Sequence, residues 1–233
     1  MERPVRNVGV ILAGGVGARL GADKKKQYLE LNGRECIAYV IDAYAEAKKL
    51  DATVVVVNRD EYETGYIARK YGLPCAPGGQ TRNESIYNGL LFVKEHYPDC
   101  EKIILHDSAR PFIRGDIIDD IMDLLDDHVC VVNGLPITDG IGMGMNTEVK
   151  REDYYISQTP EAFQFAPFFA AFDPEKPIVA LSHHLPPDIP MAHYGKFPYN
   201  LKLTFKEDVF VAETLLKAGF KEYMAQLKRE KED

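Results

Sequence analysis

The stretch VGVILAGGVGARLG, residues 8–21, decides the fold class of this chain. Val8 to Leu12 is a short apolar run rich in β-branched residues, and it ends abruptly in a cluster of glycines. A buried strand that leads into a loop has this pattern. We therefore predict a strand followed by a loop whose glycines let the backbone approach a ligand closely.

Predicted strands and helices alternate from this stretch to about residue 135. Such repeated β/α units predict an α/β fold, in which helices cover both faces of a mostly parallel sheet. Sheets of this kind bind ligands at the carboxyl ends of their strands, where the loops after Leu12 and Leu105 are expected. Helices are predicted over residues 37–48, 61–71, 82–96 and 116–125, and further strands over residues 53–57, 102–105 and 129–132.

The alternation stops at residue 133. Residues 133–158 are polar, contain several glycines and show only a patchy alternation of apolar residues. Because such a segment cannot form a core alone, we predict an extended arm, and arms of this kind often meet a partner.

The C-terminal region predicts a short strand and a helix. The strand is expected over residues 200–204, and apolar residues recur at helical spacing over residues 205–218. Thr204 and Glu207 have the spacing of a capping box, and Gly219 is expected to end the helix. Since the 233 residues contain no low-complexity linker, we expect residues 1–233 to form one domain.

The composition excludes several classes of protein. The content of 45% hydrophobic and 27% charged residues is typical of a globular chain, and the net charge of -8 argues against a nucleic-acid surface. No run approaches the roughly 20 apolar residues of a membrane span, and the start lacks the features of a signal peptide. We therefore expect a cytoplasmic protein that binds neither nucleic acid nor membranes. The four cysteines lack metal-ligand spacing and are expected to be reduced thiols.

The strongest local signal is LAGGVGARLGADKKKQY, residues 12–28, which combines glycines with Arg19 and the lysines 24–26. This combination predicts a polyphosphate cradle, and the alternative is a turn with a solvated run of charges. Leu20 occupies the position where a dinucleotide-binding fingerprint requires a small residue. Gly21 is not followed by lysine, so the P-loop pattern is absent too. A dehydrogenase and a P-loop ATPase are both disfavoured.

Asp107 follows a predicted buried strand, beside the glycine loop. A carboxylate in this place suits Mg²⁺, which takes one or two protein carboxylates and fills its other positions with waters and phosphates. The alternative is that Asp107 caps the turn and pairs with Arg110.

The turn Gly78–Ser85 opens a helix and is either a base- and ribose-binding wall or a capped helix start. Lys202 is either an anion ligand or a lysine that merely extends to solvent.

Taken together, these segments resemble the 2-C-methyl-D-erythritol 4-phosphate cytidylyltransferase family and its sister, the ribitol-5-phosphate cytidylyltransferases. The matching blocks follow the order of the family along nearly the whole chain. Several ordered motifs are far more specific than one. The blocks are LAGGVGARLGADKKKQYLELNG, GGQTRNESIYNGL, LHDSARPFI, SQTPEAF and NLKLTFKEDV.

The resemblance implies a Rossmann-like three-layer sandwich, a single nucleotidyltransferase domain whose arm, residues 133–158, makes a homodimer. It also implies roles for individual residues. Asp107 would bind Mg²⁺, and Arg19 and Lys26 would hold the CTP triphosphate. Residues around the nucleotide would be Ala13, Gly14, Gly15, Gly79, Gln80, Ser85, Asp107 and Ser108, and those around the acceptor Thr138, Asp139, Arg151, Thr159 and Lys202, with Arg19, Lys26, Arg151 and Lys202 catalytic.

The departures from the family pattern fall on the acceptor side. Asp139 is followed by glycine and not threonine, so a hydroxyl contact to the acceptor is missing unless Thr138 supplies it. Residues 181–184, LSHH, carry no carboxylate where the family has a second magnesium ligand. Either His183 or Asp188 replaces that ligand, or Asp107 binds the metal alone. Glu161 also stands where glutamine is usual.

The implied activity is transfer of CMP from CTP to a polyol phosphate, with release of pyrophosphate. The expected acceptor is 2-C-methyl-D-erythritol 4-phosphate, an isoprenoid precursor. Ribitol 5-phosphate, or another polyol phosphate of a surface polymer, is the alternative, because LAGG and HDSARPF lean towards the ribitol branch. A CTP-binding paralogue without catalysis is an alternative of another class, motivated by the missing second carboxylate.

Overall fold

A seven-stranded sheet organises the protein in the computed structural model, which describes residues 3–15, 25–142, 144, 149–177 and 179–232. The strand order is β5-β4-β1-β6-β8-β7-β9, and a separate small sheet pairs β2 (Glu30–Leu31) with β3 (Arg34–Glu35). The strands of the large sheet are β1 (Asn7–Ala13), β4 (Ala52–Val57), β5 (Cys75–Pro77), β6 (Lys102–Asp107), β7 (Cys130–Pro136), β8 (Tyr155–Gln164) and β9 (Met191–His193).

The sheet is mostly parallel, as the alternation of strands and helices predicts. Strands β5, β4, β1 and β6 pair in parallel, and so do β7 and β9. Strand β8 runs antiparallel to both of its neighbours, β6 and β7. The β-branched runs of β1 and β4 are buried because helices cover both faces of the sheet.

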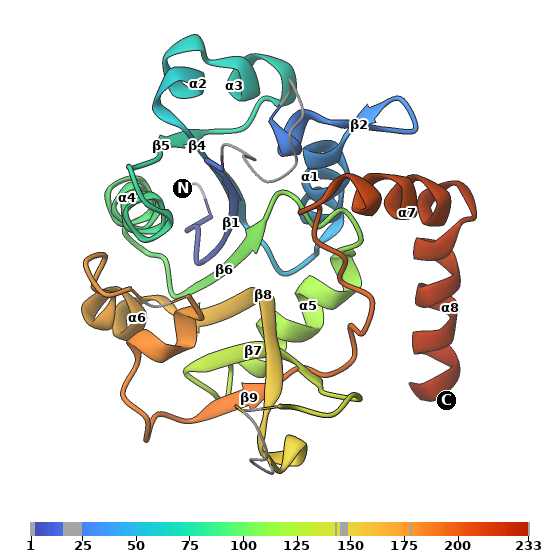
Figure 1. Ribbon diagram of the computed structural model, residues 1–233. Helices are drawn as coiled ribbons and strands as arrows, with labels where there is room; N and C mark the ends of the chain where they lie inside the picture. The colour runs from blue at the N-terminus through green and yellow to red at the C-terminus, as the bar shows by residue number, and fades with distance from the viewer. Residues whose placement is uncertain (1–2, 16–24, 143, 145–148, 178, 233) are drawn as a thin grey trace.

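Three layers result from two apolar cores, one on each face of the sheet (Figure 1). On β1 the side chains alternate, so that Ile11 enters one core and Val10 the other. Helices α1 (Cys36–Glu46) and α5 (Gly115–Leu124) cover the first face, and α4 (Arg82–His96) and α6 (Phe165–Ala171) cover the second. The expected α/β sandwich is thereby confirmed.

Three local predictions were wrong. The helix expected over residues 61–71 is two helices, α2 (Arg59–Thr64) and α3 (Tyr66–Tyr71), because Gly65 adopts a positive φ of 61° and ends the first. The capping carboxylate of α7 (Lys206–Lys217) is Asp208 and not Glu207, since its Oδ2 accepts from the backbone N–H groups of Thr204 and Phe205 at 2.7 Å. Residues 200–204 form an extended segment outside any strand.

A second C-terminal helix, α8 (Phe220–Glu232), follows Gly219 and was not predicted. It stands beside α7 at the edge of the molecule (Figure 1). Lys228 on this helix pairs with Asp116 at 3.1 Å and with Asp120 at 2.6 Å, so its terminal run of charges is partly held against α5. None of the described helices is long and apolar enough to cross a membrane.

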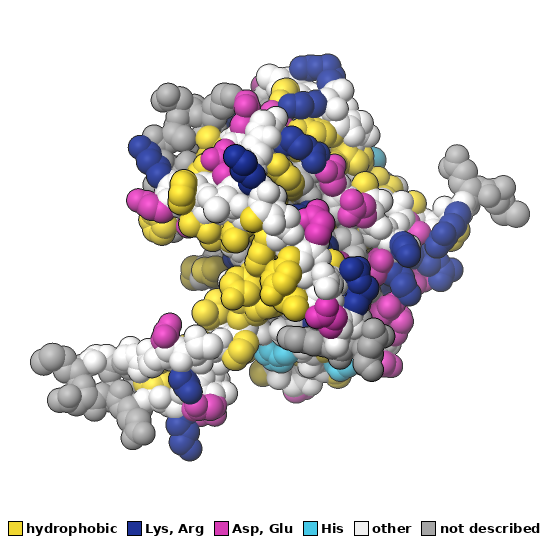
Figure 2. Space-filling model, turned by 90° about the vertical axis from the view of Figure 1, so that its right-hand side faces the viewer, with side chains coloured by type: hydrophobic (Ala, Val, Ile, Leu, Met, Phe, Trp, Pro, Cys, Tyr) yellow, Lys and Arg dark blue, Asp and Glu magenta, His cyan; other side chains and the backbone are white. Residues whose placement is uncertain are grey.

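The expected arm begins as a continuation of two core strands. Beyond a register shift after Val132, β7 and β8 continue to pair from Asn133 with Gln158 to Pro136 with Tyr155. Figure 2 shows a projection from the lower part of the molecule, at the height where Figure 1 places the start of β8. Because β8 pairs with β6 only over residues 161–164, its first half extends past the carboxyl end of β6. The arm therefore leaves the sheet at the edge where β6 ends.

Replacing Gly9 by alanine should destabilise the fold. A Cβ atom at Gly9 would lie 2.5 Å from Cδ1 of Tyr44, whose ring is buried against β1 and cannot move aside. We expect the free energy of unfolding in urea to fall by about 1–3 kcal/mol, the usual cost of overpacking a core. Gly140→Ala is the control, because nothing lies within 4 Å of its added Cβ. Equal stability of the two variants would contradict this account of the β1 packing.

Candidate active site

A cleft of about 670 Å³ opens at the carboxyl ends of β1, β4, β5 and β6. This is the edge at which open α/β sheets bind their ligands, and both loops singled out in the sequence contribute to it. The cleft is lined by Leu12, Gly14, Gly15, Lys26, Val56, Asn58, Arg59, Gly78, Gly79, Gln80, Thr81, Arg82, Glu84, Ser85, Asn88, Asp107, Ser108, Ala109 and Lys202.

The glycine loop brings Lys26 to the cleft. Gln27 next to it is buried and donates from Nε2 to the backbone oxygen of Ala13 at 2.7 Å, which fixes the end of the loop to the end of β1. A Cβ atom on Gly15 would lie 3.3 Å from Cε of Lys26, so the glycine leaves room for the lysine stem. Lys25 turns away and pairs with Glu61 at 3.0 Å. Arg19 and Lys24 lie outside the described residues.

The start of α4 forms the opposite wall. It is a capped helix start, as one interpretation of the sequence held: the N–H of Glu84 donates to the Thr81 hydroxyl at 3.1 Å, and the Glu84 carboxylate accepts from the N–H groups of Gln80 and Thr81. The same turn lines the cleft. The N–H of Gly79 donates to the Ser85 hydroxyl at 3.0 Å, and a Cβ atom on Gly79 would lie 2.3 Å from Cβ of Glu84. Only glycine fits there.

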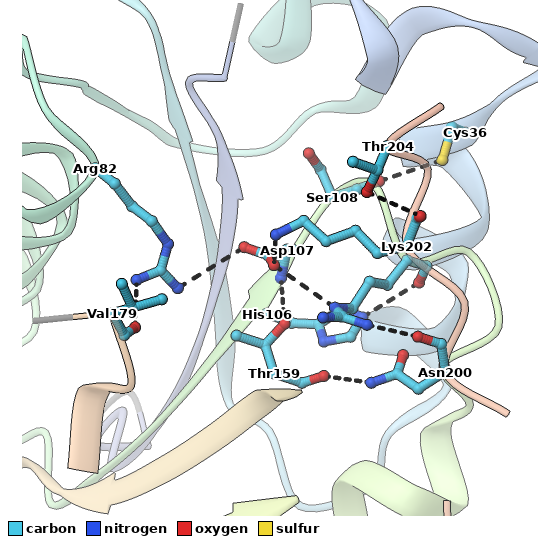
Figure 3. Close-up of polar contacts among 11 residues, drawn as sticks. Cys36, Arg82, His106, Asp107, Ser108, Thr159, Val179, Asn200, Lys202 and Thr204 are labelled. Carbon is cyan, nitrogen blue, oxygen red and sulfur yellow. Dashed lines mark hydrogen bonds and ion pairs between the residues drawn. The ribbon is translucent and has the colours of Figure 1, made fainter. Parts of the chain in front are cut away.

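Asp107 is a buried carboxylate at the end of β6, surrounded by cations (Figure 3). Its Oδ2 lies 2.6 Å from Nζ of Lys202 and 3.6 Å from Nε of Arg110, and its Oδ1 lies 4.0 Å from a guanidinium nitrogen of Arg82. Burial alone would raise the pKa of the Asp107 carboxyl, but the charges of Lys202, Arg82 and Arg110 outweigh it and hold the pKa far below its ordinary value. Asp107 is therefore ionised at neutral pH.

Arg110 positions the segment that carries Lys202. Its guanidinium donates to the backbone oxygen of Asn200 at 2.5 Å, and the N–H of Leu203 donates to the backbone oxygen of Ala109 at 2.8 Å. The Asn200 amide in turn donates to the backbone oxygen of Thr159 at 2.5 Å. Residues 200–204 thus run beside the turn after β6 without belonging to the sheet. The ion pair of Arg110 with Asp107, which was the alternative to a metal site in the sequence analysis, is present. Arg110 also positions residues 200–204 through its bond to the Asn200 carbonyl.

His106, the neighbour of Asp107, is fully buried, and burial lowers the pKa of its imidazole to about 3. The ring is therefore neutral at physiological pH. It cannot carry a proton between a substrate and solvent there.

The remaining predicted residues lie behind or away from the cleft. Ala13 is buried and presents only its carbonyl to Gln27. Thr159 is buried, and its hydroxyl accepts from the N–H of Asp107 at 3.2 Å. Thr138, Asp139 and Arg151 lie on the arm and are not among the cleft-lining residues. Arg151 donates to the backbone oxygen of Thr138 at 2.6 Å and pairs with Glu152.

Asp107 is the residue that fits a metal ion. Within the described part of the chain, no group of three or more His, Cys, Asp or Glu side chains could hold one. Of the two carboxylates that line the cleft, that of Glu84 is already used in capping α4. Neither His183 nor Asp188 lines the cleft, and His183 belongs to a separate cavity of about 400 Å³ beside Ser182. A Mg²⁺ ion with one protein carboxylate, phosphates and waters is compatible with this arrangement.

Glu161, which stands where the family usually has glutamine, is buried under the segment that lacks the second carboxylate. Its two oxygens accept from the N–H groups of Leu181 and Ser182 at 3.1 and 2.9 Å. Burial raises the pKa of the Glu161 carboxyl. The acidic group is thus used to hold the 181–184 segment and does not reach the cleft.

The lining of the cleft carries four cations, Lys26, Arg59, Arg82 and Lys202, against two carboxylates, although the chain as a whole has a net charge of -8. A local positive field in an acidic protein favours a compact polyanion. A nucleoside triphosphate is such a polyanion, so the cleft suits an enzyme that acts on nucleotides. This chain is a nucleotidyltransferase.

The comparison with known proteins gives the family. The model of IspD, 2-C-methyl-D-erythritol 4-phosphate cytidylyltransferase, matches residues 8–183, and the chain belongs to this family. A 2-C-methyl-D-erythritol 4-phosphate cytidylyltransferase from Alkaliphilus oremlandii is 30% identical over 93% of this chain and 98% of its own length. A bifunctional IspD/IspF enzyme from Mesorhizobium japonicum is 31% identical over 89% of this chain, which spans 54% of that longer protein.

Solved structures support the fold. The crystal structure of 4-diphosphocytidyl-2C-methyl-D-erythritol synthase from Anaerococcus prevotii matches with a TM-score of 0.76 at 22% identity, over 91% of this chain and 99% of that one. The bifunctional IspDF of Campylobacter jejuni matches with a TM-score of 0.75 at 23% identity, over 87% of this chain and 53% of that one. The Rossmann-like description of the sandwich rests on these neighbours as well as on the sheet.

Sequence reasoning assigned no role to several polar residues that line the cleft, among them Asn58, Arg59 and Arg82. Asn58 and Arg59 directly follow β4, so the rule that ligands bind beyond the carboxyl ends of parallel strands would have found them. Arg82 lies inside the quoted GGQTRNES motif but was not assigned a role. Its approach to Asp107 had no signal in the sequence, because 25 positions separate the two residues (107 − 82).

Replacing Arg110 by lysine should destabilise the protein although the charge is kept. Lysine lacks the planar fork that reaches Asp107 and the Asn200 carbonyl together, so one buried acceptor loses its donor. We expect the free energy of unfolding to fall by about 1–3 kcal/mol. The matched control is Arg34→Lys, whose pair with Asp42 is half exposed, with an expected change within about 0.5 kcal/mol. Urea denaturation of both variants measures the difference, and an unchanged Arg110→Lys protein would argue against the positioning role.

Proposed function

We propose that this protein transfers CMP from CTP to 2-C-methyl-D-erythritol 4-phosphate and releases pyrophosphate. The observation that carries the proposal is the meeting of Lys26, the Gly79–Ser85 turn and the Asp107–Lys202 pair around one cleft. The acceptor is the one named for the family and for its relatives.

In the proposed reaction an oxygen of the acceptor phosphate attacks the α-phosphorus of CTP. A new P–O bond forms, the bond from the α-phosphorus to the bridging oxygen breaks, and pyrophosphate leaves with that electron pair. The acceptor phosphate is already anionic and needs no general base, which agrees with the neutral, buried state of His106. Arg19 and Lys26 would stabilise the charge that develops on the phosphoryl oxygens.

Asp107 would hold Mg²⁺ together with the triphosphate. When bound, the ion would neutralise phosphate charge and orient the triphosphate for in-line attack. The carboxylate is ionised at neutral pH, and the ion would take the place that Lys202 occupies at Oδ2.

The base and ribose would lie between the glycine loop and the start of α4. The cleft-lining residues Gly14, Gly15, Gly79, Gln80, Ser85 and Ser108 would form this part of the site, with Ala13 buried behind the glycine loop. The name of the family, a cytidylyltransferase, supplies the pyrimidine base.

The acceptor would lie beside Lys202, near the edge from which the arm leaves. Thr138, Asp139 and Arg151 stand on the arm and Thr159 behind Asp107, so this half of the proposed site is open within one chain. We propose that a homodimer closes it, with the arm of one subunit reaching the cleft of the other. Exposed Tyr154 and Ile156, which are 52% and 48% accessible on the arm, support a partner surface there.

A pyrophosphate-release assay tests the function. We expect turnover with CTP, Mg²⁺ and 2-C-methyl-D-erythritol 4-phosphate, and loss of turnover with ATP, GTP or UTP or after removal of Mg²⁺ with EDTA. Ribitol 5-phosphate is included because LAGG and HDSARPF favour that branch. Preferred use of ribitol 5-phosphate would change the acceptor and keep the reaction. CTP binding without pyrophosphate release from any polyol phosphate would indicate a non-catalytic paralogue.

Mixing two inactive variants tests the shared site. In a heterodimer of Arg151→Ala with Lys26→Ala, one site receives an intact Lys26 and an intact Arg151, so activity should return to about a quarter of the wild-type value in an equal mixture. The guanidinium suits the acceptor phosphate because it offers paired donors in one plane. Native mass spectrometry verifies that heterodimers form. Heterodimers without activity would place Arg151 in the site of its own subunit.

A further inference from the structure

Three cations surround Asp107, and they differ in what else holds them. Arg110 donates to the Asn200 carbonyl at 2.5 Å, and Arg82 donates to the Val179 carbonyl at 3.1 Å. Among the residues that the structure describes, the Lys202 ammonium contacts the Asp107 carboxylate alone, at 2.6 Å. Of the three, Lys202 therefore has the head group with the fewest constraints.

The backbone of Lys202 is fixed while its side chain can turn. The neighbouring Leu203 N–H donates to the Ala109 carbonyl at 2.8 Å, and the Thr204 hydroxyl donates to the Lys202 carbonyl at 3.2 Å. The Lys202 side chain is 31% exposed at the cleft, and an ammonium on a flexible four-carbon stem can reorient without moving its Cα atom. Figure 3 shows Lys202 and Arg82 reaching Asp107 from opposite sides.

Departure of Lys202 would not leave Asp107 unpaired. Arg110 Nε lies 3.6 Å from Oδ2, and Arg82 lies 4.0 Å from Oδ1, so two charges remain near the buried carboxylate. A buried charge that loses its only partner is costly, whereas one with remaining partners can exchange. The two arginines thus make the exchange of Lys202 feasible.

We infer that Lys202 exchanges between two anions, the Asp107 carboxylate in the free enzyme and the acceptor phosphate in the loaded enzyme. Asp107 thereby sets the affinity for the acceptor in addition to holding the metal. Any cation that satisfies Asp107 releases Lys202 and strengthens acceptor binding, and by reciprocity the bound acceptor strengthens binding of that cation. The inference rests on the proposed function in taking Lys202 as an acceptor-phosphate ligand.

The test is calorimetric binding of 2-C-methyl-D-erythritol 4-phosphate in EDTA, without nucleotide. Asp107→Asn should bind it about tenfold more tightly than the wild type, because Lys202 is free of its internal partner. In a Lys202→Ala background the same substitution should change the affinity for the acceptor little. Glu84→Gln is the matched control, since it neutralises the other cleft carboxylate, which has no ion pair with Lys202, and it should also bring little gain.

Two results would overturn the exchange. One is an acceptor affinity of Asp107→Asn that equals that of the wild type. The other is an equal gain in acceptor affinity with and without Lys202, which would reflect a general change of charge. Inorganic phosphate in the same titrations gives a test that does not depend on the identity of the acceptor. If the turnover assay fails with every polyol phosphate, a Lys202-dependent gain in affinity for inorganic phosphate in Asp107→Asn still supports the exchange. If that gain is absent while turnover is observed, the exchange is overturned and the proposed function stands.

A measurement on the wild-type protein tests the exchange even if Asp107→Asn does not fold. Acceptor affinity is compared with and without Mg²⁺ and a CTP analogue that carries a methylene bridge between the α- and β-phosphates. We expect Mg²⁺ and the analogue to raise the acceptor affinity of the wild type about tenfold, and Lys202→Ala to abolish this increase. An unchanged wild-type affinity would overturn the inference.

Discussion

The burial of the Asp107 carboxylate is the constraint on which the rest of the site depends. A charge removed from water at the end of β6 requires compensation, and three cations supply it from separate parts of the chain. Arg82 comes from α4, Arg110 from the turn after β6, and Lys202 from the segment before α7. The same carboxylate therefore links the start of α4, the end of β6 and the segment before α7 at one point of the cleft.

Much of the fold followed from local sequence because helices and strands here are set by nearest neighbours and by burial on two faces. The strand over residues 53–57 and the helix over residues 82–96 were predicted almost to the residue. The errors have local physical causes that periodicity does not reveal. Gly65 could have continued a helix and instead adopts a positive φ, and Asp208 took the capping role for which Glu207 had the expected spacing.

The site was predictable as a set of motifs but not as a network. The glycine loop, the helix start at Gly79 and the aspartate at the end of β6 each carry a local pattern, and the parallel sheet brings them to one edge. Two of the contacts that join them cross 90 or more positions, those between Arg110 and Asn200 and between Asp107 and Lys202. No spacing rule encodes such pairs. The resemblance named residues on the arm, but it did not show that they lie away from the cleft of the same chain.

The single antiparallel strand, β8, divides the molecule into halves with different freedom to change. The turns that line the cleft follow parallel strands whose side chains fill both cores, so a substitution in those strands disturbs packing on two faces. On the hairpin Tyr154 and Ile156 are exposed, although Tyr155 between them packs against the second core. Exposed connecting segments tolerate exchanges better than core strands. Under the proposed function, a lineage could therefore change its acceptor through substitutions in the hairpin and keep its nucleotide chemistry.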